Sequence, residues 1–556
     1  MKLPYLSALA CLTLCSSLPL AQTSTVVLRR GDSIPGYSGG TVTTIERFVV
    51  TNNAEWLAIV DTNNPDEALD EIVIRNGILT LQEGTSLASP TGATLGGFNS
   101  LNVDTLGDLF WDLTLVGPST ALYRNTRLVA KIGDPLNTVG FSRDASWLSF
   151  NGFVLANNNN QLLVAGEVND SAIPGGSDTA MILITLDDDA NIVSTVDVAH
   201  EKGQAPVLGL LVDDTAGIAT GNPARYDLND QGQVLWTVRV ETGNTSFTRA
   251  IFLDGDLIYQ QGDPSPVPGF NWLDLQSRVS LNNRGDWLIQ GDITGPQNFR
   301  GVLVKNGELL LRERSTIPAI QPLLIDNFAN QTPIFLADSG DAIYRLQWTG
   351  PGNTDTGIMI NEEIIVREGL TNVEGTPIAE FIDGDTAIAA SPSGRYMMYE
   401  CTLEDDSRVV SLVDMGLVTP LDGCEEHTGT LRRTAGFPIV GDRVTLAMDE
   451  GQGNGVTPFL MVSDRPIFSY PPCGLVTSWG DELLIDFGAN GNPFLLLIGV
   501  PWLGSEVFLN LDITNNMSLI DKRFYAQGIF FDITNQTNGA ERLRLTNAVE
   551  IEIGAP

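Results

Sequence analysis

Residues 229–234 read Asn-Asp-Gln-Gly-Gln-Val, and residues 282–287 read Asn-Asn-Arg-Gly-Asp-Trp. Each stretch stands between two apolar runs. Asn at the start can bond its own backbone, and Gly adopts a left-handed conformation without steric cost, so the pattern predicts a hairpin turn between two strands. We therefore expect positive φ angles at Gly232 and Gly285.

The same turn pattern recurs along the chain. Looser copies stand at residues 104–109, 338–341 and 391–396, and degenerate copies at 52–56, 157–162 and 440–442. The Gly, or the residue aligned with it, falls at positions 54, 107, 160, 232, 285, 340, 394 and 441. A period near 50 residues indicates an array of similar structural units.

Each unit reads as four short strands. Around Gly285 these are residues 278–281, 287–290, 301–304 and 309–312. Asn306-Gly307 separates the last two and favours a tight hairpin, because both turn positions need positive φ. Radial repetition of four-stranded antiparallel sheets is a β-propeller. The eight turns predict an all-β, eight-bladed propeller, with seven blades as the alternative because 72 residues separate the third turn from the fourth.

The first residues of the mature chain predict how the ring closes. Residues 26–30 read as a fourth strand, and Gly31-Asp32 follows them as acidic-glycine pairs follow other fourth strands. Residues 436–463 supply up to three strands without a fourth. We expect residues 26–30 to pair with the strand near residues 459–462, which would leave no exposed sheet edge.

The sequence divides into three segments. Residues 1–21 read as a secretory signal peptide, with Lys2 before a largely apolar stretch. Residues 22–464 would form the propeller. A Pro-rich break at 466–472 then precedes residues 474–556, which carry enough short apolar runs for a small C-terminal β-sandwich.

Two motifs near the C-terminus resemble a known domain. Residues 524–532 contain a Tyr-x-Gln run followed by Asp532, and residues 545–551 begin Leu-Thr-Asn-Ala. This combination resembles a C-terminal β-sandwich found on many secreted bacterial proteins of unknown function. The repeats resemble an uncharacterised secreted bacterial β-propeller family with Asn-x-x-Gly-Asp turns. These resemblances imply a fold and export from a bacterial cell, but no activity.

The composition is acidic. Lys and Arg number 31 against 68 Asp and Glu, a formal net charge of -37. Such a chain repels nucleic acid and anionic membrane surfaces and attracts Ca²⁺ only loosely. Beyond the signal peptide, no apolar run reaches the length of a membrane helix. We expect a secreted or periplasmic monomer.

Three cysteines follow the signal peptide: Cys401, Cys424 and Cys473. Export permits a disulfide. Three pairings are open, each with one thiol left over, and the sequence does not choose among them.

Residues 280–287 are similar to the Asp-box of sialidase propellers, S-x-D-x-G-x-T-W. They carry one extra residue before Gly and lack its Thr or Ser. They also fall between the first and second strands of a unit, whereas the Asp-box joins the third and fourth. The sequence shows no arginine cluster and no assignable Tyr/Glu nucleophile pair. These differences disfavour a glycosidase.

Metal ligands are equally sparse. His200 and His427 are far apart and lie in no metal-binding motif. Residues 187–191 imitate the start of a calcium loop, but Ile192 and Val198 replace the required Gly and Glu. We predict a solvated hairpin turn there.

The sequence therefore assigns no catalytic, cofactor-binding or metal-binding residue. The favoured function is that of a secreted, non-catalytic binding or structural protein on a propeller scaffold, with an extracellular protein or polysaccharide as partner. The alternative is an extracellular glycan-active enzyme, either a hydrolase or a lyase.

Overall fold

The computed structural model describes residues 24–556, apart from 105–106, 118, 172–177, 214–224, 244–245, 276–277, 329–331, 385, 425–426, 428, 450–455, 468–472, 478–480, 487–493, 500–504 and 532–542. The expected signal peptide, residues 1–21, lies outside this part. The described chain is built from β-strands, with short 3-10 helices at η2 (Gln297–Phe299), η3 (Pro318–Ile320) and η4 (Met517–Leu519). The all-β prediction is confirmed.

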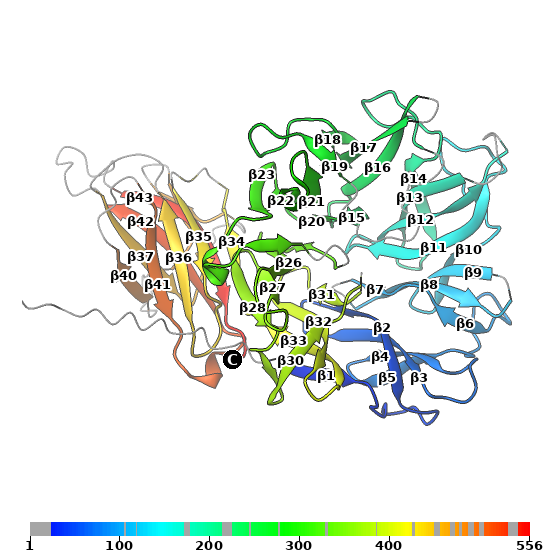
Figure 1. Ribbon diagram of the computed structural model, residues 1–556, viewed down its shortest axis with the longest axis horizontal. Helices are drawn as coiled ribbons and strands as arrows, with labels where there is room; N and C mark the ends of the chain where they lie inside the picture. Colours follow the sequence, from blue (N-terminus) through cyan, green and yellow to red (C-terminus); the bar gives the residue numbers. More distant parts are fainter. Residues whose placement is uncertain are drawn as a thin grey trace, which may run out of the picture.

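Residues 25–414 form antiparallel sheets that follow one another along the chain (Figure 1). The first three contain β2 (Val42–Val50), β3 (Trp56–Thr62), β4 (Glu71–Arg75) and β5 (Ile78–Gln82); β6 (Leu95–Phe98), β7 (Asn102–Val103), β8 (Leu109–Leu115), β9 (Ser119–Arg124) and β10 (Arg127–Lys131); and β11 (Ser146–Ala156), β12 (Gln161–Asn169), β13 (Asp178–Leu186) and β14 (Ile192–His200).

The next four sheets repeat this plan. They contain β15 (Tyr226–Leu228), β16 (Val234–Gly243), β17 (Ser246–Leu253) and β18 (Asp256–Gln260); β19 (Trp272–Asp274), β20 (Val279–Leu281), β21 (Trp287–Ile293), β22 (Gly301–Lys305) and β23 (Glu308–Arg312); β24 (Ile325–Asn327), β25 (Phe335–Leu336), β26 (Ala342–Trp348), β27 (Thr356–Ile360) and β28 (Glu363–Arg367); and β29 (Asn372–Val373), β30 (Thr376–Phe381), β31 (Ile388–Ala390), β32 (Tyr396–Leu403) and β33 (Arg408–Asp414), together with β1 (Thr25–Arg29).

The sheets have a propeller-like arrangement. Each has one inner strand: β2, β7, β11, β15, β20, β25 and β31, of which those labelled in Figure 1 lie toward the centre of the ring. Consecutive inner strands contact each other from β2 to β25, and β31 contacts β2. Between β25 and β31, the backbone N–H of Asp338 donates to the carbonyl oxygen of Pro392 at 2.9 Å. The apolar core lies mainly between neighbouring sheets, as in the cluster shared by β2, β3 and β32.

The prediction of eight blades is not confirmed. The described residues contain seven sheets of this type. Gly441, the eighth aligned position, lies instead in a different part of the fold, where its N–H donates to the carbonyl of Ile513.

The predicted turn conformation is confirmed. Gly232 and Gly285 have φ angles of 80° and 83°. The aligned residues Ala54 and Asn160 also have positive φ, at 59° and 57°, so the turn keeps its left-handed residue even where Gly is missing. At the start of one turn, Asn282 Oδ1 accepts hydrogen bonds from the backbone N–H groups of Arg284 and Asp286, at 3.0 and 2.9 Å.

The asparagine at the start of these turns also joins neighbouring sheets. Asn157 Nδ2 donates to the carbonyl of Asn229 at 2.8 Å, and Asn229 Nδ2 donates to the carbonyl of Asn282 at 3.1 Å. Asn282 Nδ2 in turn donates to the carbonyl of Ala337 at 3.0 Å. One amide therefore holds its own turn through the oxygen and the next sheet through the nitrogen, which explains why these three positions carry Asn instead of Asp.

We expect Asn282→Ala to lower the free energy of unfolding by about 2–3 kcal/mol, because it removes the acceptor of two turn N–H groups and one of the two donors to the Ala337 carbonyl in the next sheet. Asn298→Ala, at an exposed position in η2, is the control and is expected to change stability by less than about 0.5 kcal/mol. Urea unfolding of the two variants measures the difference. Equal midpoints would show that the amide does not join the sheets.

The N-terminal strand has a different partner from the one expected. β1 pairs with β33, with Thr25 opposite Leu412 and Arg29 opposite Val409. The prediction that it pairs with residues 459–462 is therefore wrong. β1 is followed by a glycine, as other outer strands are. The N–H of Gly31 donates to the carbonyl of Val42, and the N–H of Gly133, after β10, likewise donates to the carbonyl of Trp147.

The C-terminal sheets begin earlier than the sequence suggested. They contain β34 (Leu417–Leu421), β35 (Thr430–Ala435), β36 (Arg443–Asp449), β37 (Thr457–Ser463), β38 (Leu475–Val476), β39 (Glu482–Leu483), β40 (Phe494–Ile498), β41 (Val507–Asp512), β42 (Arg523–Phe531) and β43 (Leu543–Glu552). One sheet has the order β34-β43-β42-β37-β40, and a second has the order β35-β36-β41. A shared apolar core, including Leu446, Leu460 and Phe530, connects them.

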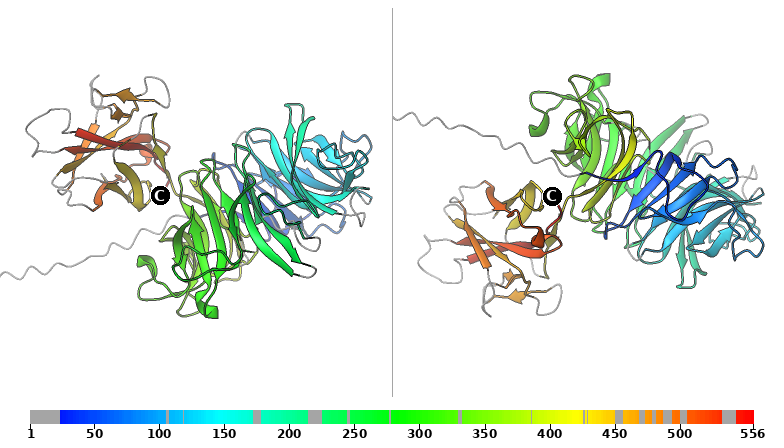
Figure 2. Two further views of the ribbon diagram at one scale, coloured as in Figure 1. Left: turned by 90° about the horizontal axis from the view of Figure 1, so that it is seen from above. Right: turned by 90° about the horizontal axis from the view of Figure 1, so that it is seen from below.

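The predicted boundaries at 464 and 474 are thus wrong. β34 to β37 precede the Pro-rich break, yet they pair with β40 to β43, which follow it. Residues 436–463 resembled propeller strands because the alternation of apolar and polar residues identifies a strand but not its partner. We call residues 415–556 the C-terminal unit; Figure 2 shows it as a separate body beside the seven sheets.

Two buried arginines hold the C-terminal unit against the seven sheets. Arg395, beside a propeller turn, contacts Asp521 at 2.6 Å and also Glu552, both in the C-terminal unit. Arg433, on β35, contacts Asp341 at 2.9 Å and Glu363 at 3.2 Å, both in the sixth sheet. The two bodies are therefore joined by charge-assisted bonds in which the arginine side chains are buried.

Candidate functional site

A cavity of 320 Å³ lies where the inner strands converge. Segments from all seven inner strands line it: 47–50, 101–104, 154–158, 226–230, 279–283, 333–338 and 386–392. Its volume is at the lower end of the range of small-molecule sites. The repeat thus builds a single site on the ring axis, to which each sheet contributes a short segment.

One end of the cavity has a polar margin, here called the turn rim: Asn158, Asp230, Asn283 and Asp338. These are the second residues of four turns and all line the cavity. Asn158 donates to Asp230 through its backbone N–H and its side chain, at 2.8 and 2.7 Å. Asn283 donates to Asp338 in the same way, at 2.8 and 3.1 Å. Asp230 N–H donates to Asn283 Oδ1 at 2.7 Å. The rim is therefore one fixed hydrogen-bonded chain.

The other end carries positive charge. Arg47, which lines the cavity, stands seven residues before the aligned turn position Ala54. Arg225 and Arg278 stand seven residues before Gly232 and Gly285. Five residues of extended strand, ~16 Å, separate this level from the turn rim. Three equivalent positions in the ring thus carry arginine. The constant offset from the turns identifies these three positions from the sequence alone.

Tyr226 lies next to this charge. Tyr226 lines the cavity and is only 2% exposed, and its hydroxyl has no hydrogen-bond partner. Burial raises the pKa of Tyr226 above its usual value, and the positive charge of Arg47 partly opposes that rise. The phenol therefore remains protonated and can donate a hydrogen bond.

Asp227, the next residue on β15, also lines the cavity. Its carboxylate accepts hydrogen bonds from the backbone N–H of Leu281 at 2.7 Å and from the Ser280 hydroxyl at 3.2 Å. Burial nevertheless raises the pKa of Asp227 to about 6. Ser280 Oγ accepts in turn from the N–H of Leu336 at 2.9 Å. Asp227 and Ser280 thus connect three successive inner strands.

This arrangement combines hydrogen-bond donors and acceptors in one cavity. Arg47 and Tyr226 supply donors. Asp104, Asp227, Asp230 and Asp338 supply the carboxylates of the lining. Ser280, the hydroxyl nearest to a carboxylate, is already held on both sides. The cavity is equipped to bind and orient a polar molecule.

Of the remaining sequence candidates, His200 and the turn at residues 187–191 lie elsewhere, whereas residues 280–283 of the Asp-box-like stretch line the cavity. His200 contacts Asp197 at 2.7 Å, and neither residue lines the cavity. Asp187 accepts from the N–H groups of Asp189 and Asn191, both at 2.9 Å, in the turn between β13 and β14, so the hairpin prediction is confirmed. Residues 280–287 lie between β20 and β21, as expected. In the described part of the chain, no group of three or more His, Cys, Asp and Glu side chains is placed to hold a metal ion.

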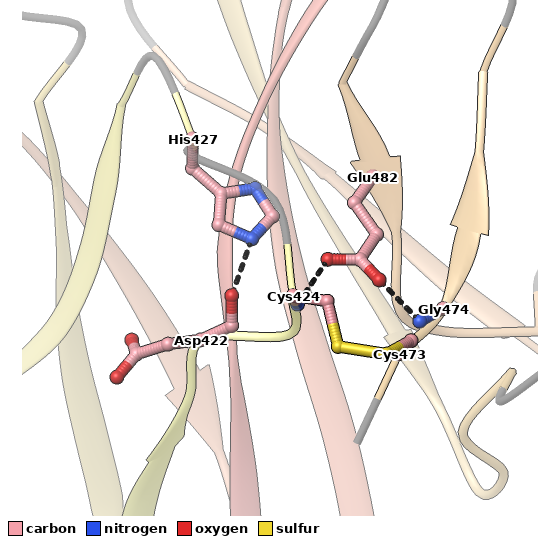
Figure 3. Close-up of a disulfide and its surroundings, with 6 residues drawn as sticks. All are labelled: Asp422, Cys424, His427, Cys473, Gly474 and Glu482. Carbon is pink, nitrogen blue, oxygen red and sulfur yellow. Dashed lines mark hydrogen bonds between the residues drawn. A yellow bond between two sulfur atoms is a disulfide. The ribbon is translucent and has the colours of Figure 1, made fainter. Parts of the chain in front are cut away.

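The disulfide joins Cys424 to Cys473 (Figure 3). Glu482 stabilises both ends, because its carboxylate accepts from the N–H of Cys424 at 2.7 Å and from that of Gly474. His427 Nε2 lies 2.8 Å from the Asp422 carbonyl oxygen in the same loop. Cys401 is a buried free thiol on β32, and burial raises its pKa to about 12. The open question of pairing is thereby settled.

Comparison with known families gave no match to a family model, and no curated protein matches either. Solved structures with a similar fold include a Trypanosoma rangeli sialidase in complex with 2,3-difluorosialic acid. It is 10% identical, with 96% of this chain and 93% of that chain covered and a TM-score of 0.27.

Two further solved structures are similar at the same level. BBS1N in complex with ARL6DN is 9% identical, with 70% of this chain and 98% of that chain covered and a TM-score of 0.30. A GH43_12 protein from a capybara gut metagenome is 9% identical, with 96% of each chain covered and a TM-score of 0.23. Likenesses this weak assign no activity to this chain.

Within the residues that the structure describes, no helix is long and apolar enough to cross a membrane.

Proposed function

We propose that this chain is an exported binding protein: a seven-bladed propeller, closed by β1, that holds a small polar ligand in its axial cavity. The observation that carries the proposal is the lining of that cavity, to which all seven inner strands contribute. A rigid scaffold that directs polar groups from many elements to one point is typical of a binding site.

The hydrogen bonds around the ring support this role. Asn157, Asn229 and Asn282 each fix one turn to the next sheet. Lining residues on a rigid scaffold need little ordering when a ligand binds, so less of the interaction energy is lost. The signal-like N-terminus and the Cys424–Cys473 disulfide support export, because disulfides persist in oxidising compartments.

A cavity-filling variant tests the proposal. Leu155 lines the cavity and is half-buried, so Leu155→Trp is expected to occupy the ligand's space. Val193→Trp, at a position 65% exposed on β14, is the matched control. Both proteins would be compared with the wild type in a calorimetric screen of sugars, sugar acids and short oligosaccharides. We expect a ligand that binds the wild type and the control but not Leu155→Trp. Equal binding by all three would place the site elsewhere.

A second candidate function is glycan cleavage, and the clustering of Arg47, Tyr226 and Asp227 favours it, because glycoside hydrolysis needs a raised-pKa acid beside a second reactive group. The same oligosaccharides, incubated with the protein and assayed for new reducing ends, separate the two functions. We expect binding without release. Release that is lost in Asp227→Asn would establish the enzyme instead.

A further inference from the structure

We propose that the axial cavity is selective for a sugar acid: a molecule the size of one sugar ring that carries one carboxylate and several hydroxyls. The carboxylate would bind at Arg47 and Tyr226, and the hydroxyls would face Asp227, the lining carboxylate next to Tyr226 on β15. This assignment rests on the proposed function and specifies its ligand.

Arg47 provides the anchor for the carboxylate. It is the only basic residue among the described residues that line the cavity. A guanidinium presents five N–H donors in a planar fork that matches a carboxylate, and the resulting bidentate pair is among the stronger hydrogen-bonded contacts in proteins.

Tyr226 provides the second donor. Buried hydroxyl groups are nearly always hydrogen-bonded, because an unpaired one loses its contacts with water without replacement. Among the described lining residues, Tyr226 is the one with a buried polar atom that lacks a partner. The hydroxyl lies in the field of Arg47, where an anionic acceptor would be stabilised by both groups. A bound carboxylate therefore satisfies the one unpaired group of the site.

The other lining charges define the rest of the ligand. Asp227, Asp230 and Asp338 already accept hydrogen bonds from the protein, but a carboxylate has about four acceptor positions, so each can accept another donor. These carboxylates would repel a ligand with several negative charges. A sugar acid instead brings its single carboxylate to Arg47 and its hydroxyl donors to Asp227.

Calorimetric titration with glucuronate and with glucose, its neutral counterpart, tests this selectivity. We expect glucuronate to bind at least about tenfold more tightly than glucose, because glucose cannot pair with the guanidinium. Arg47→Gln should weaken glucuronate binding by about tenfold and leave glucose binding nearly unchanged. Arg127→Gln, which removes an exposed arginine on β10, is the control and should bind as the wild type does.

Tyr226→Phe keeps the test decisive if Arg47→Gln fails to fold. The variant deletes an unpaired hydroxyl, so the melting temperature should stay equal or rise, whereas glucuronate affinity should fall by about threefold or more. Equal affinity of wild type and Tyr226→Phe, or equal affinity for glucose and glucuronate, would overturn the assignment.

The outcomes also separate this inference from the proposed function. A neutral or cationic sugar whose binding is lost in Leu155→Trp would overturn the sugar-acid assignment and leave the axial site intact. If Leu155→Trp binds every ligand as the wild type does, both are wrong.

Discussion

Replacing Arg433 by Met is expected to lower the free energy of unfolding by about 3–5 kcal/mol, because it leaves two largely buried carboxylates without their shared partner. The Arg433 side chain is 7% exposed and contacts Asp341 and Glu363. Burial alone would raise the pKa of Asp341, but the charge of Arg433 lowers it below its usual value. Urea unfolding at neutral pH measures the loss.

The neighbouring residue gives a matched control. Arg432 lies on the same strand, and its side chain is 54% exposed and pairs with Glu506. Arg432→Met should therefore change the free energy of unfolding by less than about 1 kcal/mol. Adding Asp341→Asn and Glu363→Gln to Arg433→Met should restore part of the loss, since no unpaired charge would then be buried. If the single variants at 432 and 433 are equally stable, Arg433 does not join the two bodies.

A fragment of residues 474–556 is expected to lack a folded structure, whereas residues 415–556 should fold. The shorter fragment lacks β37, which lies between β42 and β40, and β36, which pairs with β41. Without them, much of the apolar core has no partner, and an isolated two-stranded β42–β43 hairpin is at best marginally stable.

Circular dichroism and thermal unfolding of the two fragments check this directly. We expect a cooperative transition for 415–556 and none for 474–556. A cooperative transition in the shorter fragment would restore the boundary that the Pro-rich break suggested and would mean that β37 contributes little to the core.

The repeat turns were the most predictable part of the fold. A left-handed residue at a fixed position has a local cause, so the sequence identifies Gly232 and Gly285 without knowledge of their neighbours. The partner of β1 and the assignment of β36 and β37 depend on contacts between distant residues. The alternation of apolar and polar residues along a strand does not encode those contacts. It therefore predicts propeller strands where the structure has the C-terminal unit.

The site was less predictable for the same reason. Tyr226 occupies a position that the other six sheets fill with apolar residues, and only its burial without a partner distinguishes it. The disulfide also depended on the fold: Cys401 and Cys424 are close in sequence, but Cys401 is buried on β32, and Cys473 lies beside Cys424. In contrast, the sequence alone shows the constant seven-residue offset between the aligned turn residues and Arg47, Arg225 and Arg278.

A crystal structure of the full chain soaked with glucuronate tests the central claim most directly, that the ring axis is the binding site. We predict electron density for one sugar ring in the axial cavity, with its carboxylate within hydrogen-bond distance of the Arg47 guanidinium and the Tyr226 hydroxyl. Glucuronate bound on the outer strands or on the C-terminal unit, with the axial cavity free of it, would contradict the claim.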